Sequence, residues 1–324
     1  MDDRLALTLV TGFLGSGKTT LIRRYIETDQ GADTGVIVNE FGEAGVDHSL
    51  FVHAAEQVEL VDGGCLCCAK RADVAQAMYR LVQMSRETGA FRRTVLETSG
   101  LADPAPIVAT LQNDPWLKSH VRLASIVTVI DAVAGIGNLG LHPEARRQLS
   151  LADTVVVTKT DMRASQDFDT LVEAIRRHSP DARIFDAQDP DYLAHDIFGG
   201  AGTPAFAHGL DVPGEAERHS ADLSSFTLRI AETLDWPVFT LWLSALLHAH
   251  GDRILRVKGL LKTSSADTRL AVHGVQHVMH PPIHLPADEA DESYLVFITR
   301  GIEKAAISSS FQRTMTWGAM TGAR

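Results

Sequence analysis

The segment GFLGSGKT at residues 12–19 constrains the fold of this chain more than any other feature. It directly follows an apolar run at residues 5–11 and opens a helical pattern at residues 19–27. Three glycines let the backbone curl so that successive N–H groups converge on one point. The following helix N-terminus adds about half a positive charge. The segment therefore predicts a phosphate-binding loop (P-loop) between a strand and a helix of an α/β domain.

The polar residues of this loop have separate predicted tasks. Lys18 supplies a mobile ammonium for the β- and γ-phosphates of a nucleotide, and the Thr19 hydroxyl is offered to Mg2+. The alternative, a glycine turn without a ligand, does not account for the lysine and threonine together with the correct flanks. The predicted nucleotide-binding residues of this segment are Gly12, Gly15, Ser16, Gly17, Lys18, Thr19 and Thr20.

Short apolar runs alternate with helical patterns through the first half of the chain. Because strands this apolar are buried on both faces, they predict a mainly parallel sheet with helices on both sides, as in P-loop NTPases. We expect this α/β domain to span residues 1–186. The predicted strands are 5–11, 35–39, 93–97, 124–131, 154–158 and 182–185, and the predicted helices are 19–27, 72–87 and 167–178.

The second half follows a different pattern. Residues 187–222 are rich in Asp, Pro, Gly and His without a sustained period, which predicts an exposed linker. A smaller α+β domain with an antiparallel sheet is expected at residues 223–324. Its predicted strands are 225–230, 254–262, 269–279 and 294–299, and its predicted helices are 236–248 and 302–311.

The segment VVVTKTD at residues 155–161 indicates guanine as the base. A buried strand brings Lys159 and Asp161 to its carboxyl end, where ligands of open α/β sheets bind. The Asp161 carboxylate can accept hydrogen bonds from guanine N1–H and N2–H2, a donor pair that adenine lacks, while the stem of Lys159 covers the base. Thr158 stands where such a motif usually has Asn. An ordinary strand-end turn with solvated charges is the alternative.

A second acidic strand end, VLETSG at residues 95–100, fits the metal side of a nucleotide site. Glu97 can hold a water bound to Mg2+, and Gly100 lets a backbone amide approach the γ-phosphate. Many P-loop proteins carry Asp where this chain has Glu97. The alternative for Glu97 is a charge that starts a helix.

The chain has three cysteines, Cys65, Cys67 and Cys68, within four positions after Gly63-Gly64. An odd, clustered set is a poor disulfide framework and is typical of a thiolate site in a reducing compartment. Three close sulfurs suit zinc or another thiophilic ion, with at least one more ligand. Buried small hydrophobic residues are the alternative.

Composition excludes some classes of function. With 30 Lys+Arg and 41 Asp+Glu, the net charge is 30 − 41 = −11, which argues against nucleic acid as the main partner. No stretch approaches the roughly 18 to 20 apolar residues of a membrane span, and the first residues do not resemble a secretory signal. We therefore expect a cytoplasmic protein with no membrane partner.

Together these motifs resemble the CobW-like family of P-loop GTPases, metal-handling relatives of the urease and hydrogenase nickel-insertion GTPases. The resemblance covers nearly the whole chain, and the glycine-cysteine motif is its most specific part. The matching segments are residues 12–19, NEFGE at 39–43 with Asp47, GCLCC at 64–68, Glu97 with Gly100, TKTD at 158–161, RILRVKG at 253–259 and HGVQH at 273–277.

The resemblance implies a GTP-hydrolysing metallochaperone whose metal-binding motif is Cys65, Cys67 and Cys68. Zinc is the favoured cargo, with Co2+ and iron left open. Some members carry a histidine-rich storage loop near the domain junction. Here that region has only well-separated histidines, which speaks against storage: His195, His208 and His219.

The cysteines lie between two segments expected at the γ-phosphate and Mg2+. Because nucleotide hydrolysis orders or releases such segments, we hypothesise that GTP and GDP states differ in metal affinity. Glu40, Glu43 and Asp47 are the candidates for orienting the hydrolytic water. Glu40 and Glu43 are alternatively metal ligands beside the cysteines, and Glu43 is the acidic residue assigned to the metal. Plain solvated charges are the third interpretation of these residues.

Two other classes of function stay open. One is a regulatory GTPase that senses metal or redox state without handing over an ion, and the other is a P-loop kinase that uses ATP. For the chaperone, the expected partner is a client metalloprotein bound through the C-terminal domain, and a homodimer is left open. Histidines of that domain are alternatively metal ligands, client contacts or solvated residues; His273 and His277 are expected on one strand face, and His248 and His250 near a helix end.

Overall fold

The computed structural model describes residues 4–37, 49–54, 57–62, 71–162, 165–189, 191–195, 197–198, 218–219, 223–265, 267–279, 281–285 and 293–321. By its internal contacts the chain divides into two compact units. The N-terminal unit comprises Met1–Ile175 and Ala182–His208, and the C-terminal unit comprises Arg176–Asp181 and Gly209–Arg324.

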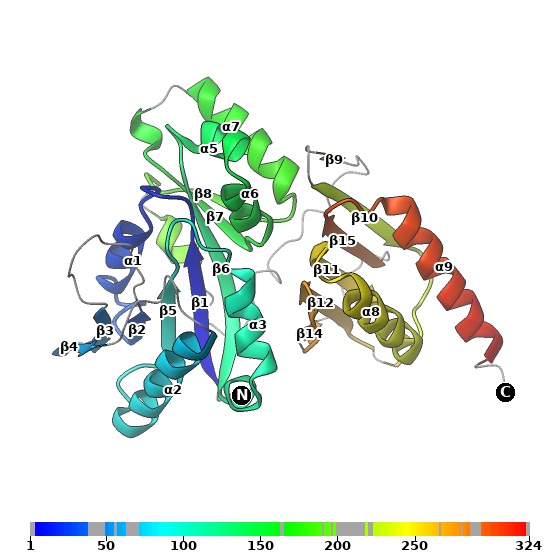
Figure 1. Ribbon diagram of the computed structural model, residues 1–324, viewed down its shortest axis with the longest axis horizontal. Coiled ribbons are helices and arrows are strands. Elements are labelled where there is room, and N and C mark those ends of the chain that lie inside the picture. Colours follow the sequence, from blue (N-terminus) through cyan, green and yellow to red (C-terminus); the bar gives the residue numbers. More distant parts are fainter. Residues whose placement is uncertain are drawn as a thin grey trace. The chain divides into compact units, whose positions relative to one another are not determined.

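The N-terminal unit is built on an eight-stranded sheet with the order β4-β3-β2-β5-β1-β6-β7-β8 (Figure 1). The described strands from β2 to β8 in this order pair in parallel, whereas β3 and β4 are antiparallel strands at the edge beyond β2. The predicted parallel sheet is confirmed, and the β3–β4 hairpin was not predicted. The strands are β1 (Leu5–Thr11), β2 (Thr34–Ile37), β3 (Ser49–Ala54), β4 (Gln57–Asp62), β5 (Arg93–Glu97), β6 (Val121–Asp131), β7 (Thr154–Thr158) and β8 (Arg183–Asp186).

Helices cover both faces of this sheet, as the doubly apolar strands require. On one face, Leu21, Ile22 and Tyr25 of α1 pack against valines of β1, β6 and β7. On the other, α5, α6 and α7 pack against Ile130 of β6 and Val155 of β7. The helices are α1 (Lys18–Ile26), α2 (Arg71–Thr88), α3 (Ala105–Asn113), α4 (Pro115–His120), α5 (Gly135–Leu141), α6 (Pro143–Ser150) and α7 (Ser165–His178).

The residues that follow β8 belong to the core of this unit. Tyr192 of the short helix η3 (Tyr192–His195), Ile197 and Phe198 are buried in the cluster that includes α1, and the rings of Phe198 and Tyr25 stack with centroids 3.8 Å apart. The prediction of an exposed linker is therefore wrong at these positions. These three apolar residues lie in a polar stretch that has no helical or strand periodicity, so the sequence pattern did not indicate that they are buried. The domain boundaries stay a prediction.

The C-terminal unit is an antiparallel sheet with the order β13-β12-β11-β15-β10-β9 and β14 beside β12, which confirms the predicted α+β class. Its helices are α8 (Trp236–His250) and α9 (Lys304–Thr321). Its strands are β9 (Arg218–His219), β10 (Ser224–Ile230), β11 (Ile254–Lys262), β12 (Arg269–Val275), β13 (Val278–Met279), β14 (Ile283–Leu285) and β15 (Ser293–Thr299).

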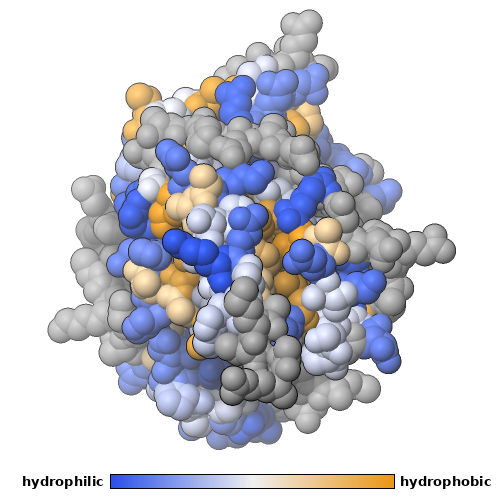
Figure 2. Space-filling view, turned by 90° about the vertical axis from the view of Figure 1, so that its right-hand side faces the viewer, coloured by the Kyte–Doolittle hydropathy of each residue, from blue (hydrophilic) through white to orange (hydrophobic). Residues whose placement is uncertain are grey.

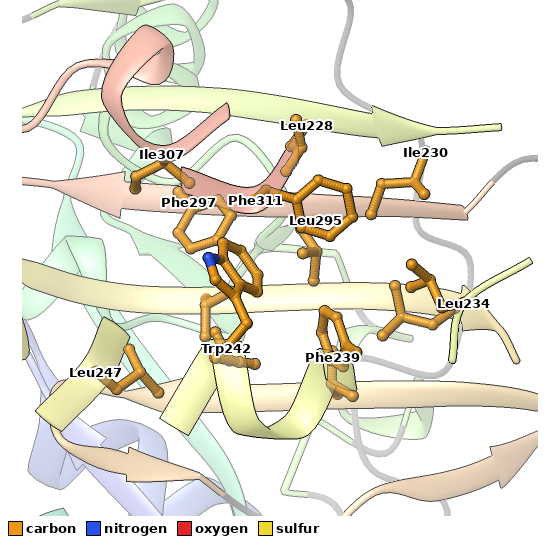
Figure 3. Close-up of a cluster of buried hydrophobic side chains, with 14 of the residues drawn as sticks. Leu228, Ile230, Leu234, Phe239, Trp242, Leu247, Leu295, Phe297, Ile307 and Phe311 are labelled. Carbon is orange, nitrogen blue, oxygen red and sulfur yellow. The ribbon is translucent and has the colours of Figure 1, made fainter. Parts of the chain in front are cut away.

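Aliphatic and aromatic side chains together form the core of this unit (Figure 3). Trp242 of α8 lies edge-on to Phe297 of β15 and Phe311 of α9, with centroids 6.5 and 5.0 Å away. Helix α8 starts where Asp235 accepts a hydrogen bond from the Val238 amide at 3.1 Å, a capping contact that fixes its first turn. The aromatic cluster therefore joins both helices to one face of the sheet.

Apolar side chains on the face shown in Figure 2 form separate patches with hydrophilic residues between them. Among the described residues, no helix combines the length and the apolar character that crossing a membrane requires.

Candidate functional site

Four neighbouring strands of the N-terminal unit end at the same edge of the sheet. β1 runs into the P-loop, its neighbours β5 and β6 end at Glu97 and Asp131, and β7, beside β6, ends at Thr158. The strand register aligns Val10 with Glu97 and Asp131 with Thr158. Parallel pairing therefore brings together the two segments that the sequence analysis assigned to the metal side and the base side of a nucleotide.

The P-loop passes very close to the neighbouring strand β6. A Cβ atom at Gly12, whose φ is +144°, would lie 2.3 Å from the Val129 carbonyl oxygen, so only glycine fits there. Gly15 and Thr20 are exposed, whereas the Ser16 side chain is buried. Gly17 is the N-cap of α1.

The two functional side chains that start α1 point in different directions. The Lys18 ammonium donates to the carbonyl oxygens of Gly12 at 3.0 Å and Phe13 at 3.2 Å, which keeps this charge inside the loop. The Thr19 hydroxyl donates to Glu97 at 2.9 Å to Oε1 and 3.1 Å to Oε2. The Glu97 side chain is buried, so its carboxylate faces the loop and not open solvent.

The segment after β5 continues along the P-loop strand. The Thr98 amide donates to the Val10 carbonyl at 2.9 Å, and its hydroxyl donates to Thr11 Oγ1 at the same distance. These contacts extend the β1–β5 pairing beyond Glu97 and bring Gly100 against Leu14 of the P-loop. The predicted γ-phosphate residue therefore lies beside the predicted phosphate loop.

The base-side segment is tied to the P-loop by two side chains. Thr158 donates from Oγ1 to the Ser16 carbonyl at 2.7 Å, and Lys159 donates from Nζ to the Gly15 carbonyl at 2.9 Å. The threonine that stands in place of the usual Asn thus contacts the phosphate loop. Lys159 has a φ of +58°, a conformation that aims the following residues away from the strand direction.

Asp161 lies exposed in the short helix η2 (Thr160–Met162). Its Oδ1 accepts a hydrogen bond from Gln188 Nε2 at 3.0 Å. The neighbouring Thr160 hydroxyl donates to Asp186 Oδ1 at 2.6 Å. Gln188, just after β8, therefore orients the carboxylate predicted to read guanine, and the carboxylate stays accessible.

Sequence reasoning missed Asp131, which lies at the end of β6. Its carboxylate pairs with the Lys159 ammonium and accepts hydrogen bonds from the amides of Val133 at 2.7 Å and Ala134 at 3.2 Å. Burial acts to raise the pKa of Asp131, but these hydrogen bonds outweigh it and hold the pKa below the usual value. The available signal was an acidic residue at the end of a buried strand, the same signal that identified Glu97.

The predicted metal ligands Cys65, Cys67, Cys68 and Glu43, and the predicted catalytic residues Glu40 and Asp47, lie outside the described residues. Among the residues that are described, no three His, Cys, Asp or Glu side chains group into a metal site.

The expectation that His273 and His277 share a strand face is wrong. β12 ends at Val275, and Gln276, with a φ of +51°, turns the chain before His277. His273 is buried, whereas the His277 ring contacts the Leu247 carbonyl at 2.9 Å and Asp252 Oδ1 at 3.1 Å. His248 and His250 lie in the last turn of α8, as expected.

Comparisons with known proteins agree with this arrangement. The family described as "CobW/HypB/UreG, nucleotide-binding domain" matches residues 6–186, and the "Cobalamin synthesis protein cobW C-terminal domain" matches residues 223–315. The chain is 31% identical over 315 residues to the "Zinc chaperone YjiA" of Escherichia coli, covering 95% of this chain and 98% of that protein. It is 29% identical to the "Zinc chaperone CobW" of Pseudomonas aeruginosa, covering 96% of this chain and 92% of that protein.

Among solved structures, the chain resembles the "Zn(II)-bound YjiA GTPase from E. coli" with a TM-score of 0.70 and 28% identity, covering 96% of this chain and 99% of that one. The two family models together cover most of both units, and the similarity to the solved structure extends over both units as well. The chain therefore belongs to the CobW/HypB/UreG family, with a nucleotide-binding domain followed by a CobW C-terminal domain.

Proposed function

We propose that this chain hydrolyses GTP and carries zinc to a client metalloprotein. The structural observation that supports this most is the contact of Thr19 with Glu97 beside the P-loop. Metal-assisted phosphoryl transfer needs a hydroxyl and a carboxylate at this place to hold Mg2+. The similarity to zinc chaperones over nearly the whole chain supports zinc as the cargo.

The nucleotide is proposed to bind across the carboxyl ends of β1, β5, β6 and β7. Its phosphates meet the backbone of the P-loop and the ammonium of Lys18, which exchanges its carbonyl contacts for stronger charge-assisted bonds to phosphate. Guanine is read by Asp161 and covered by the stem of Lys159. The full proposed set is Gly12, Gly15, Ser16, Gly17, Lys18, Thr19, Thr20, Gly100, Lys159 and Asp161.

The residues present fit Mg2+. A hydroxyl and a carboxylate lie within hydrogen-bonding distance at the start of α1, and oxygen ligands are those that Mg2+ prefers. Thr19 would hold the ion directly and Glu97 through a water. When bound, Mg2+ supplies charge that neutralises the phosphate oxygens.

Zinc is the cargo of the proposed function, with Cys65, Cys67 and Cys68 as thiolate ligands and Glu43 beside them. Glu40 and Asp47 are proposed to orient the hydrolytic water. All six residues lie in the part of the chain between β2 and β5. The cysteines proposed to bind zinc and the acidic residues proposed to lie near the γ-phosphate therefore belong to the same connecting segment. Nucleotide state and zinc affinity are therefore proposed to be coupled.

The client is proposed to bind through the C-terminal unit, whose edge strands offer backbone groups for pairing. The clustered thiols are typical of the cytoplasm, which is the proposed compartment. Self-association as a homodimer stays a prediction.

Nucleotide choice tests the first half of the proposal. The full-length chain with Mg2+ is expected to release phosphate from GTP and to bind GTP more tightly than ATP. A preference for ATP with phosphate transfer to a small molecule would instead identify a P-loop kinase.

Zinc transfer tests the second half. Zinc affinity should fall strongly when Cys65, Cys67 and Cys68 are all changed to Ser, because the thiolates are removed. The wild-type chain should then pass zinc to a client in the presence of a competing chelator. Zinc binding without transfer would identify a sensor GTPase, and unchanged affinity in the triple variant would contradict the cysteine site.

A further inference from the structure

The amide of Gln148 contacts the loop that follows β5. Its Nε2 donates to the carbonyl oxygens of Gly100 at 3.1 Å and Ala102 at 3.0 Å. Gln148 lies on α6 and its side chain is 0% exposed. Both N–H groups of one buried amide are therefore directed to two carbonyls of the same loop, an arrangement that fixes the position of that loop.

Gln148 is itself anchored to the central sheet. The Thr128 hydroxyl of β6 donates to the backbone carbonyl of Gln148 at 3.0 Å, and both residues are buried. The neighbouring contact between α6 and this loop, Arg147 with Asp103 at 3.7 Å, is partly exposed and therefore weak. Gln148 is thus held to β6 by its backbone carbonyl and to the loop by its side-chain amide, and both contacts are better shielded than the Arg147–Asp103 pair.

The opposite side of the loop touches the P-loop. A Cβ atom at Gly100 would lie 2.6 to 2.8 Å from the Cδ2, N and Cα atoms of Leu14, so backbone meets backbone here without space for a side chain. Gly100 is thus held between Leu14 on one side and Gln148 on the other. A shift of this loop would change its distance from the P-loop.

Gln148 also shares a cavity with a residue of the P-loop. Ser16 and Gln148 both line a cavity of about 20 Å³, which is large enough for one water molecule. Within the described part of the chain, Ser16 Oγ and Gln148 Oε1 are buried without a hydrogen-bond partner. Gln148 therefore contacts the loop after β5 and lines a cavity together with a residue of the P-loop.

We infer that Gln148 is a positioning residue for the γ-phosphate of GTP. It holds residues 100–102 so that the Gly100 amide stays at the place where a γ-phosphate meets the P-loop. This inference rests on the proposed GTP function. GDP lacks the γ-phosphate, so the loss of this support should weaken the binding of GTP and spare the binding of GDP.

Gln148→Met tests the inference, because methionine fills a similar volume and donates no hydrogen bond. We expect the affinity of the full-length chain for a non-hydrolysable GTP analogue to fall by about tenfold, with kcat also reduced. The affinity for GDP should stay within about twofold of the wild-type value, since GDP lacks the phosphate that this loop is proposed to meet. A purely structural role would weaken both nucleotides equally.

Ser85→Ala is the matched control. It removes a hydrogen bond from Ser85 Oγ on α2 to the Phe91 carbonyl at 2.7 Å, in the same unit but away from the predicted nucleotide residues. Both affinities should remain unchanged in this control. If Gln148→Met does not fold, Gln148→Asn keeps an amide that is one methylene too short and should show the same selective loss.

Equal losses for GDP and the GTP analogue, or no loss for either, would overturn the inference. Failure of the wild-type chain to bind the GTP analogue would contradict the proposed function instead, so the two failures are distinguishable.

Discussion

The hydroxyl of Thr19 donates to both carboxylate oxygens of Glu97, although the two residues are 78 positions apart in the chain. The parallel pairing of β1 with β5 places Glu97 level with Val10, so the carboxylate lies beside the start of α1. One hydrogen bond thus joins the P-loop to the segment that continues toward Gly100. Magnesium binding, phosphate binding and the position of the γ-phosphate loop are expected to depend on this pair.

Glu97→Gln should lower kcat for GTP hydrolysis by about 100-fold, because a neutral amide supports a metal-bound water poorly. Phosphate release at saturating GTP and Mg2+ measures the effect. Asp103→Asn, a partly exposed carboxylate on the same connection, is the matched control and should change kcat little. Equal kcat values for the wild type and Glu97→Gln would show that Glu97 does not support the metal in GTP hydrolysis.

Asp161→Asn should weaken GTP binding by at least about tenfold and favour a xanthine nucleotide, because the amide presents a donor where guanine N1–H needs an acceptor. Competition binding with GTP and a xanthine nucleotide measures the change. Asp189→Asn alters a nearby exposed carboxylate and should leave the preference for guanine intact. Unchanged GTP use by Asp161→Asn would defeat the base assignment.

Asp131→Asn should change how stability depends on pH. The pKa of Asp131 is lower in the folded state, so its contribution to stability is present above the unfolded pKa of about 3.9 and is lost as the pH falls through the folded pKa. At pH 7 the variant should lose about 1 to 2 kcal/mol, because the anionic acceptor of the Lys159 ammonium is replaced by a neutral amide.

Urea unfolding between pH 2 and pH 7 checks this prediction, with the pH range set by the acid side of the unfolded pKa of about 3.9. Below pH 4 the stability of the wild type should decline more steeply than that of Asp131→Asn. Parallel pH profiles for the two proteins would show that the ion pair with Lys159 does not stabilise the fold.

The strongest local patterns predicted the framework of the site well. GFLGSGKT, the buried strand before Glu97 and the strand before Thr158 each carry their signal within a few neighbouring residues. Parallel pairing then follows from the apolar character of these strands, so the convergence of their ends could be expected.

Contacts between distant segments could not be predicted in this way. Asp131, the partner of Lys159, is 28 residues away in the chain. Gln148 has no special feature in the sequence, and its role depends on its contacts with β6 and with the loop after β5. Helix α5 has the sequence GIGNLGL, whose glycines hide its helical pattern. Phe198 becomes a core residue because it stacks on Tyr25, a contact that no local period reveals.

Asp181→Ala should destabilise the chain by about 3 kcal/mol, because it leaves buried cations without this counter-charge. The Asp181 carboxylate lies 3.1 Å from Lys258 Nζ and 3.9 Å from Arg256, and all three side chains are at most 2% exposed. Asp252→Ala is the matched control, since Asp252 is 92% exposed in its pair with His277. It should cost less than about 1 kcal/mol.

Urea unfolding of the full-length variants measures both values. The account of the C-terminal unit is contradicted if the buried and the exposed aspartate cost the same.

Nucleotide state is proposed to control the affinity of this chain for zinc. The most direct measurement is the zinc dissociation constant of the full-length chain against a competing chelator, once with GDP and once with a non-hydrolysable GTP analogue. The two constants should differ by at least about fivefold, and zinc should shift the relative affinity for the two nucleotides by the same factor, because coupling is reciprocal. Equal zinc dissociation constants in the two nucleotide states would contradict the account.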